Sequence, residues 1–492
     1  MIVDVTAGVP DVELEVGFLS ADDAGIEAAS VRGDGAIHAA RTLGPKVLGE
    51  TDAAHLLGGA PLQAVVGLGE RESVTTEVLR RAVARAVNLA IDLRRGTLSL
   101  RTPDVQRLGV DEVVEAFAES ALLTAHARTR RPTVSAKPDG TQPPERCAIL
   151  VTGESHHLHA SLERARAVVE AVRLARELGD VPANRLAPLQ LAQRAADAAR
   201  AAGLSAEVLD ASALEAAGAG LLLAVGSGSS RGPALAVLRY RPPGASRHVA
   251  VVGKGITFDA GGISIKPAKS MGDMVHDKAG AAAAAGIAVG AARLGLPVAV
   301  TAVLACAENL PSGAAYRPGD VLTGLDGSTV EIIDTDAEGR LVLADALTYA
   351  LRCSEELRVD AIVDLATLTG SIVSALGNEA AGLFGNDDEL AARMLSAAST
   401  AGEPLWRMPI LAGHRAQLKS ERADRKQCAD RWGDCAIAAA FLEAYVDKRP
   451  WLHLDIAGVA YNEGSPEWPA YHPKSGAAGA GVRTVLRFLA AF

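Results

Sequence analysis

Residues 331–341 read Glu-Ile-Ile-Asp-Thr-Asp-Ala-Glu-Gly-Arg-Leu, a stretch in which three carboxylates follow an apolar run at close spacing. The apolar residues from Val330 to Ile333 predict a buried strand, and the run Leu341–Leu347 predicts that a helix follows. The acids therefore fall on the turn at the carboxyl end of a strand, where α/β sheets bind ligands. Carboxylates this close together indicate a bound cation, although a solvated turn would carry the same pattern.

A second polar segment, Val251–Lys266, reads Val-Val-Gly-Lys-Gly-Ile-Thr-Phe-Asp-Ala-Gly-Gly-Ile-Ser-Ile-Lys. The apolar run His248–Val252 predicts a strand, and the glycines predict that it opens into a loop. Lys254, Asp259 and Lys266 lie on this segment, and Asp277 follows it. Lysines and acids arranged in this way indicate either a metal site or a structural cluster of salt bridges.

The triplet Gly253-Lys-Gly255 begins like a dinucleotide-binding fingerprint. That fingerprint requires a third glycine at position 258 and a helix directly after it. Phe258 stands there instead, and Ile263-Ser-Ile265 predicts a further strand. A P-loop is excluded as well, because the chain has no Gly-Lys-Ser or Gly-Lys-Thr triplet at this position.

These two stretches resemble the two signatures of the leucyl aminopeptidase family, whose members are homohexameric exopeptidases with two metal ions. The resemblance covers residues 180–492 and is faint over residues 1–150. It continues through four further stretches: Val181-Pro-Ala-Asn184, Ala366-Thr-Leu-Thr-Gly370, Trp451-Leu-His-Leu-Asp-Ile-Ala-Gly458 and Gly481-Val-Arg483.

The resemblance implies two divalent metal ions per subunit, Mn²⁺ or Zn²⁺, bridged by Asp259 and Glu338. It assigns Lys254 and Asp277 to the tighter site and Asp336 to the looser site. Carboxylates provide the hard oxygen ligands that such a pair needs. A lysine can bind a metal only as the neutral amine, and two nearby dications would lower its pKa enough to produce that form.

The implied function is a metal-dependent aminopeptidase that releases N-terminal amino acids, preferably leucine-like, through a two-metal-activated hydroxide. Lys266 would be a charged amine that stabilises the oxyanion. Arg340 would bind bicarbonate, which relays the proton. The arginine cannot serve as a base itself, because its guanidinium group stays protonated at ordinary pH. A free α-amino group on the peptide would ligate one metal, which explains why only the first peptide bond is cleaved.

The resemblance also implies a pocket for the first side chain of the substrate. Its residues are mostly apolar, which suits leucine or methionine, although each of them would also fit ordinary core packing. They are Met274, Thr367, Leu368, Gly370, Ala457 and Ala460.

Several positions depart from the family pattern, among them the turn Lys474-Ser-Gly476. Asp334 replaces a usual asparagine and adds negative charge, and Lys278 replaces a usual methionine and would compensate that charge. Asp434 stands where relatives commonly have a small residue.

The expected fold class is α/β, with a smaller N-terminal domain and a larger catalytic domain in which helices flank a central mixed sheet. We expect the N-terminal domain at residues 1–147, a linking strand and helix at 148–178, and the catalytic domain at 179–492. The Pro-rich polar segment 128–145 marks the end of the first domain. Residues 279–306 are apolar but rich in Ala and Gly, and they predict a buried helix and a strand at 298–304, not a membrane span.

Composition sets further bounds. The chain has 492 residues and is 49% hydrophobic, which is enough for large buried cores. Its five cysteines form no Cys-x-x-Cys pair, and its N-terminus has no basic or strongly apolar leader, so we expect a cytoplasmic protein without membrane partners.

Two other functions stay open at this point. One is a DNA-binding architectural protein with secondary peptidase activity. However, residues 1–170 contain 24 Asp and Glu against 18 Lys and Arg, so the basic surface that binds nucleic acid is not expected. The other is a dinuclear metal enzyme of phosphoryl transfer, for which Lys266 and Arg340 provide few phosphate-binding cations.

Overall fold

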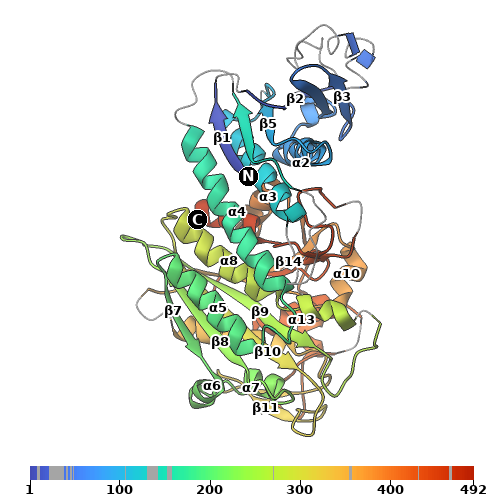
Figure 1. The fold of residues 1–492 in the computed structure, drawn as a ribbon. Helices are drawn as coiled ribbons and strands as arrows, with labels where there is room; N and C mark the ends of the chain where they lie inside the picture. Colours follow the sequence, from blue (N-terminus) through green and yellow to red (C-terminus); the bar gives the residue numbers. More distant parts are fainter. Residues whose placement is uncertain are drawn as a thin grey trace. The chain divides into compact units, whose positions relative to one another are not determined.

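The computed structural model describes residues 1–7, 11–21, 38–39, 43–44, 47, 49–105, 107–129, 142–151, 158–269, 271–353, 357–429, 432–464 and 468–492. These residues divide into two compact units (Figure 1). Unit 1 comprises Met1–Val169 and Asn462–Ser475, and unit 2 comprises Glu170–Tyr461 and Gly476–Phe492. Most of the expected linker at 128–145 lies outside the described residues. Each unit combines a sheet with helices, so the predicted α/β fold of two domains is confirmed.

Unit 1 is built on a six-stranded sheet of order β1-β6-β5-β2-β4-β3, in which only β3 is antiparallel to its neighbour. Helices α2 (Thr76–Asp92) and α3 (Val110–Thr129) pack against each other, and a buried ion pair of 3.0 Å joins Arg80 Nε to Glu119 Oε2 between them. The strands are β1 (Ile2–Thr6), β2 (Leu14–Leu19), β3 (Ala54–Gly58), β4 (Leu62–Gly67), β5 (Thr97–Arg101) and β6 (Arg146–Leu150), and η2 spans Arg71–Ser73.

The segment Asn462–Ser475 belongs to unit 1 although it follows nearly all of unit 2 in the chain. Tyr471 on this segment is buried, and its hydroxyl donates a hydrogen bond of 2.7 Å to Glu77 Oε1 on α2. Unit 1 is therefore assembled from two parts of the chain that are far apart in sequence.

Unit 2 is built on an eight-stranded mixed sheet of order β15-β14-β17-β13-β9-β10-β8-β7. The four central strands β17, β13, β9 and β10 are parallel, and antiparallel neighbours flank them. The strands are β7 (Ser205–Leu209), β8 (Ala234–Tyr240), β9 (His248–Asp259), β10 (Ala299–Asn309), β13 (Ala361–Ala366), β14 (Ala381–Gly385), β15 (Leu405–Arg407) and β17 (Trp451–Asp455).

The other elements of the chain are mainly helical. Figure 1 shows α5 and α8 lying along the strands β7 to β10. The helices are α4 (Leu158–Asp180), α5 (Pro188–Ala201), α6 (Ala211–Ala217), α7 (Gly220–Gly226), η3 (Met271–His276), α8 (Ala279–Arg293), α9 (Gly339–Arg352), α10 (Gly370–Leu376), α11 (Asp388–Ala401), α12 (Ala412–Gln417), α13 (Asp434–Glu443) and α14 (Val482–Ala490). The short strands are β11 (Val321–Thr323), β12 (Thr329–Glu331), β16 (Arg425–Lys426), β18 (Tyr461–Asn462) and β19 (Gly476–Ala477).

The glycines of Gly253-Lys-Gly255 allow α8 to approach β9 closely. A Cβ on Gly253 would lie 2.5 Å from the carbonyl oxygen of Gly280, and one on Gly255 would lie 3.1 Å from Cβ of Ala281. Because side chains alternate along a strand, Lys254 points to the opposite face, where α9 begins. The triplet that looked like the start of a dinucleotide fingerprint is thus a packing feature.

Two sequence expectations need correction. Ile263-Ser-Ile265 forms no strand but a turn, in which Ile263 and Ile265 are 45% and 64% exposed. The strand expected at 330–333 is β12, which pairs with β11 and β16 in a separate small sheet and not in the central one. Ile333 lies beyond β12 and is 39% exposed, so the apolar run there is only partly buried.

The Ala-rich helix was predicted correctly: α8 is buried throughout Ala279–Ala291, and β10 follows it. None of the helices in the described part of the chain combines the length and the apolar character needed to cross a bilayer.

Candidate active site

The carboxyl ends of the four parallel strands meet at one edge of the central sheet and supply polar groups there. Asp259 ends β9, Asn309 ends β10 and Asp455 ends β17, while Thr367 follows β13 directly. Asn309 pairs in register with Asp259, so these two lie side by side. This edge is the usual position of ligand sites in α/β folds.

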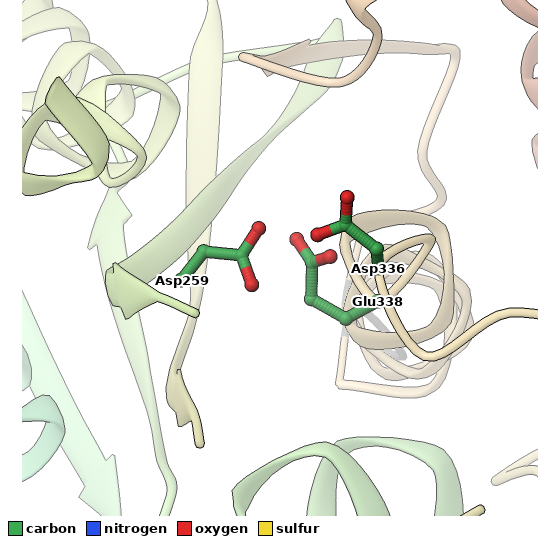
Figure 2. Close-up of side chains that lie close together, drawn as sticks. All are labelled: Asp259, Asp336 and Glu338. Atoms are coloured by element: carbon green, nitrogen blue, oxygen red, sulfur yellow. The ribbon is translucent and has the colours of Figure 1, made fainter. Parts of the chain in front are cut away.

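The acidic loop after β12 brings further carboxylates to the same place. Asp336 lies on the loop and Glu338 is the N-cap residue of α9. One carboxylate oxygen from each of Asp259, Asp336 and Glu338 lies within 4.8 Å of the other two. Figure 2 shows the three carboxylates facing one another. The two sequence stretches that carry the family signatures therefore converge on one cluster.

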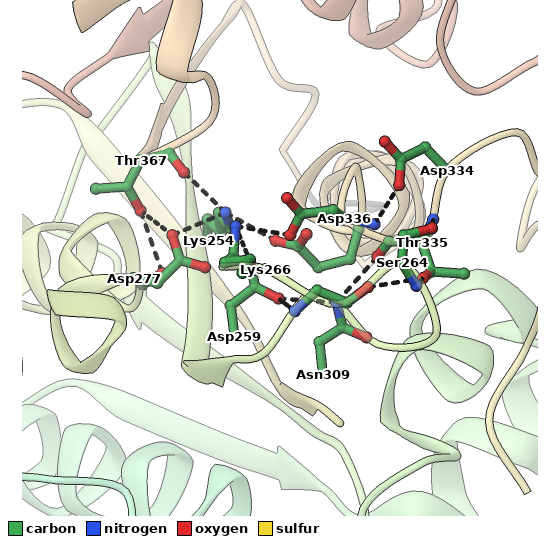
Figure 3. Close-up of polar contacts among 12 residues, drawn as sticks. Lys254, Asp259, Ser264, Lys266, Asp277, Asn309, Asp334, Thr335, Asp336 and Thr367 are labelled. Atoms are coloured by element: carbon green, nitrogen blue, oxygen red, sulfur yellow. Dashed lines mark hydrogen bonds and ion pairs between the residues drawn. The ribbon is translucent and has the colours of Figure 1, made fainter. Parts of the chain in front are cut away.

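Two lysines form ion pairs with these three carboxylates and with Asp277 (Figure 3). Lys254 Nζ lies 2.8 Å from Asp277 Oδ1 and 2.9 Å from Glu338 Oε1, and it donates a hydrogen bond of 2.7 Å to the carbonyl oxygen of Thr367. Lys266 Nζ lies 2.9 Å from Asp259 Oδ2 and 2.6 Å from Asp336 Oδ1. Each of the five expected metal ligands therefore takes part in an ion pair, in one group around Lys254 and another around Lys266.

The electrostatics of the cluster follow from its burial. Burial and the neighbouring Asp259 raise the pKa of Glu338 to about 7 and the pKa of Asp336 to about 7. Burial likewise raises the pKa of Asp277 to about 6, although Lys254 opposes this shift. For Lys254, burial lowers the pKa, but Asp277, Glu338 and Asp259 outweigh it and the net shift is upward.

The donor set fits divalent cations. Asp277 Oδ2 is buried and has no hydrogen-bond partner among the described residues, so an oxygen is available for a metal ion. Carboxylate oxygens are hard ligands of the kind that Mn²⁺, Mg²⁺ and Zn²⁺ accept. Lys254 would join the ligands once cations displaced its proton.

The loop that carries Asp336 is held in shape by hydrogen bonds from its own residues. Asp334 Oδ1 accepts a bond of 2.9 Å from the backbone N–H of Asp336, a role that an asparagine oxygen would fill equally well. Thr335 Oγ1 donates to the carbonyl of Gly261 at 2.6 Å and accepts from the N–H of Ser264 at 2.8 Å. These bonds connect the acidic loop to the loop after β9.

Three supporting residues were not found from the sequence. Asn309 Nδ2 donates to Asp259 Oδ1 at 2.8 Å and to the carbonyl of Thr335 at 3.0 Å, which orients the carboxylate of Asp259. Gln427 is buried, and its side chain accepts from the N–H of Ile333 and donates to the carbonyl of Asp334. Isolated amides carry no sequence pattern, so only the fold reveals them.

The third supporting residue is Asp455, which organises part of the expected substrate pocket. Its Oδ1 accepts from the N–H of Leu368 at 3.1 Å and of Ala457 at 3.3 Å, and its Oδ2 accepts from Thr369 Oγ1 at 2.7 Å. Thr367 Oγ1 donates to Asp277 Oδ1 at 2.6 Å. The motif Trp451–Gly458, noted for the resemblance, contains Asp455.

The other expected pocket residues are placed as follows. Met274 lies on η3, and its carbonyl accepts from the N–H of Asp277 at 3.3 Å. Gly370 is exposed at the start of α10, and a Cβ there would meet no atom within 4 Å. Ala460 is only 1% exposed.

Arg340 and Lys278 differ from expectation in their surroundings. The guanidinium of Arg340 is already bound to a carboxylate, since its Nη2 donates to Asp434 Oδ1 at 2.9 Å. Lys278 is fully buried and donates to the carbonyl of Val275. Burial lowers the pKa of Lys278 to about 7, and the carboxylate that opposes this shift is Asp277, not Asp334 as expected.

Residues 173–486 match the catalytic domain of the cytosol aminopeptidase family, and residues 49–131 match its N-terminal domain. The chain belongs to the cytosol aminopeptidase family. Family membership makes it a peptidase hydrolase and a metal-dependent aminopeptidase, as the two signature stretches predicted.

Individual relatives agree along most of the chain. A probable cytosol aminopeptidase of Roseiflexus castenholzii is 41% identical over 436 residues, which are 88% of each chain. A probable cytosol aminopeptidase of Streptomyces griseus is 43% identical over 444 residues, which are 87% of this chain and 84% of that one. The solved structure of the bottromycin maturation enzyme BotP in complex with Mn has a TM-score of 0.85 and 36% identity, and the match covers 98% of this chain and 99% of that one.

Proposed function

We propose that this aminopeptidase binds two divalent cations, Mn²⁺ or Zn²⁺, in the carboxylate and lysine cluster at the edge of the central sheet. Asp259 and Glu338 would bridge them, Lys254 and Asp277 would complete one site, and Asp336 the other. The observation that carries this proposal is the convergence of Asp259, Asp336 and Glu338 within 4.8 Å. When bound, such a cation pair supplies an activated water and polarises the scissile carbonyl.

The two lysines have different tasks in this proposal. Lys254 lies between Asp277 and Glu338, both proposed ligands, so it has to give up its proton to enter the ligand set. Lys266 stands on the other side of the cluster, between Asp259 and Asp336, and its side chain is 21% exposed. It can therefore remain an ammonium group that faces the substrate and stabilises the developing oxyanion.

The substrate is a peptide with a free N-terminus and a leucine-like first residue. Thr367 donates a hydrogen bond to Asp277, and the backbone N–H groups of Leu368 and Ala457 both donate to Asp455 Oδ1. In this proposal the first side chain of the substrate lies next to the cations, on the side of Thr367. Met274, Gly370 and Ala460 complete the proposed pocket. The mostly apolar character of this set favours leucine or methionine at the first position.

Hydrolysis of a leucyl anilide before and after chelation tests the proposal. We expect activity to be lost on chelation and restored by Mn²⁺ or Zn²⁺, with two ions bound per chain. Asp259→Ala should lower kcat/KM by at least ~10²-fold, because metal assistance is worth several kcal/mol. Asp197→Ala, which removes a surface ion pair of 2.9 Å with Arg200, is the control and should leave activity unchanged.

A blocked substrate tests the requirement for a free α-amine. N-acetyl-leucyl anilide should not be cleaved, because its amide nitrogen cannot ligate a metal. Turnover of the acetylated compound at a rate comparable with that of the free one contradicts this part of the proposal, and full activity of Asp259→Ala contradicts the dinuclear site.

We also propose that the enzyme is a cytoplasmic homohexamer. The proposal rests on the family resemblance and on relatives that are named cytosol aminopeptidases. Subcellular fractionation tests the location.

A further inference from the structure

Unit 2 contains a cavity of about 290 Å³ that residues at the end of α12, on β16 and on α13 line. Part of its wall is apolar, since Leu418, Ala440 and Phe441 line it and are at most 6% exposed. An apolar wall with a few polar groups around it is the usual form of a site for a small organic molecule. The volume is at the lower end of the range for such sites, so the cavity suits a molecule about as large as an amino acid.

Three cations line the same cavity, and two of them have no counter-ion in the protein. Arg415 is neutralised by Glu443, because its Nε and Nη2 donate to the two carboxylate oxygens at 2.6 and 2.8 Å. The side chains of Lys419 and Arg425 make no ion pair or hydrogen bond with another residue that the structure describes. The guanidinium of Arg425 lies over the ring of Tyr445 instead, 4.8 Å from its centre. Lys419 and Arg425 are therefore available to an anion.

Arg425 carries a further sign of a missing partner. Its Nη1 is buried and has no hydrogen-bond acceptor among the described residues. A desolvated donor without an acceptor is unfavourable, and a small rotation of the guanidinium towards an anion in the cavity would give it one.

The charge of the lining also favours an anion. The lining residues carry three positive and two negative charges, a net charge of +1 on a chain whose net charge is −10. The second acid, Asp424, accepts hydrogen bonds of 2.8 and 2.7 Å from the N–H and hydroxyl of Thr329 through one oxygen, Oδ2. Its other oxygen can accept from an ammonium group, so a zwitterion is compatible with the site.

One wall of the cavity continues into the acidic loop that carries the proposed metal ligands. Arg425 begins β16 and pairs in register with Val330 of β12, the strand that precedes this loop. Two residues later, the side chain of Gln427 accepts from the N–H of Ile333 and donates to the carbonyl of Asp334. A displacement of Arg425 would therefore be passed to the loop through Gln427.

The opposite wall leads to the same region through α13. Phe441 lies on this helix, and Asp434, its first residue, accepts a bond of 2.9 Å from Arg340 Nη2. Arg340 lies two positions after Glu338 at the start of α9. A molecule that holds α13 and β16 together would thus restrain the acidic loop from both sides.

We propose that this cavity is a binding site for a small carboxylate with an apolar group, such as a free amino acid or a short branched-chain acid. The carboxylate would lie between Lys419 and Arg425, with the apolar group against Leu418 and Phe441. Because both walls lead to the acidic loop, we expect the bound molecule to raise the affinity for metal ions. This coupling rests on the function proposed above, whereas the binding itself does not.

The first experiment measures binding without catalysis. The full chain, kept free of metal by a chelator, is titrated in a calorimeter with 4-methylpentanoate, with L-leucine and with inorganic phosphate. We expect the two carboxylates to bind with a Kd of ~1 mM or lower and phosphate, which has no apolar group, to bind more weakly. A difference between the two carboxylates measures the contribution of the ammonium group.

Variants locate the bound molecule. Lys419→Gln and Arg425→Gln should each raise the Kd of 4-methylpentanoate by ~10-fold, because each removes a charge-assisted contact. Ala444→Leu should abolish binding with both cations in place, because Ala444 lines the cavity and a larger side chain would fill it. Arg173→Gln is the control, since it removes an exposed cation that lies 3.9 Å from Glu177 on α4, outside the cavity. It should bind as the wild type does.

The second experiment measures the coupling. Mn²⁺ is titrated into the wild type and into Arg425→Gln, each with and without saturating 4-methylpentanoate. In the wild type the Mn²⁺ affinity should rise by ~5-fold or more, within the usual range of coupling between two sites. In Arg425→Gln it should not change.

Four results would contradict the inference. Absence of saturable binding, or equal binding in wild type, Lys419→Gln, Arg425→Gln and Ala444→Leu, would refute the site. Phosphate binding as tight as that of 4-methylpentanoate would refute the class of ligand. An unchanged Mn²⁺ affinity would refute the coupling and leave the site in place. A chain that binds the carboxylate but no Mn²⁺ would refute the proposed function and not the cavity.

Discussion

At the scale of single residues, the cluster carries more negative than positive charge. Four carboxylates, Asp259, Asp277, Asp336 and Glu338, share two ammonium groups, Lys254 and Lys266. The lysines therefore neutralise only part of the charge when every acid is ionised. The excess can be relieved in two ways, by protonation of the acids or by divalent cations.

The first prediction concerns pH. The pKa values of Asp336 and Glu338 are raised to about 7 and that of Asp277 to about 6 by burial, so the folded metal-free protein binds more protons than the unfolded chain between about pH 4 and 7. This contribution to stability is full below the unfolded pKa values and disappears as the pH rises through the folded ones. The Tm of the metal-free protein should therefore fall from pH 5 to pH 8.

Metal binding should have the opposite dependence. Cations require ionised carboxylates, so the rise in Tm caused by Mn²⁺ should be larger at pH 8 than at pH 5. Differential scanning calorimetry of the chelated and Mn²⁺-loaded protein measures both trends. A metal-induced rise in Tm that is the same at both pH values would contradict this view of the cluster.

Residues in motifs were predictable, and residues that support them were not. Asp336 and Glu338 stand in one short run of acids, and close spacing of like charges is itself a signal. Gln427 lies far along the chain from the loop it holds, and a single glutamine has no pattern around it. Asp434 was noticed only as an unusual residue, because its pairing with Arg340 depends on how α13 packs near α9.

At the scale of elements, the start of α9 lies against the lysine of β9. A Cβ on Gly339 would lie 2.7 Å from Cε and 2.8 Å from Nζ of Lys254. Gly339→Ala should therefore push the amine away from Asp277 and Glu338. We expect metal affinity to fall by ~10–100-fold, the usual cost of disturbing a supporting contact, while the fold survives. Titration calorimetry with Mn²⁺ measures the change.

Gly313→Ala is the matched control for this substitution, because a Cβ at Gly313 would meet no atom within 4 Å. It should bind metal as the wild type does. Unchanged affinity in Gly339→Ala would mean that Lys254 moves without consequence and is not a ligand.

The contact of α8 with the sheet gives a prediction on stability. A Cβ on Gly280 would lie 2.1 Å from the carbonyl oxygen of Leu365 on β13, and a backbone atom cannot move aside easily. Gly280→Ala should lower the free energy of unfolding by about 1–3 kcal/mol, the usual cost of overpacking a core. Urea denaturation followed by circular dichroism measures it.

Gly413→Ala on α12 serves for comparison. No atom lies within 4 Å of a Cβ there, and alanine favours a helix by up to ~1 kcal/mol over glycine. Its stability should be equal to that of wild type or slightly higher. Equal effects of the two substitutions would show that α8 can shift away from β13.

The elements also show where sequence patterns succeed. The buried helix α8 was predicted because Ala and Gly extend over several turns between two polar ends. The strand expected at Ile263–Ile265 was wrong because two isoleucines in alternation satisfy the strand pattern while Gly261 and Gly262, with φ values of 86° and 67°, turn the chain. Short apolar runs beside glycines are therefore weaker signals than long ones.

At the scale of the whole molecule, the proposed homohexamer gives a prediction about mass in solution. A homohexamer of this 50.6 kDa chain should have a mass of roughly 300 kDa by light scattering coupled to gel filtration. The mass should not depend on metal loading if the cluster serves catalysis alone. A monomeric mass at micromolar concentration would contradict the proposed assembly.

Unit 1 is built from two separate segments of the chain, and this has a consequence for its biosynthesis. Its parts, Met1–Val169 and Asn462–Ser475, leave the ribosome separated by nearly the entire catalytic unit. At about 5–20 residues per second, the wait between them is roughly 15–60 s. Until then α2 lacks Tyr471 as the hydrogen-bond donor to Glu77. The nascent unit 1, although translated first, cannot be completed before the closing segment emerges, so premature release of the chain would leave it unfinished.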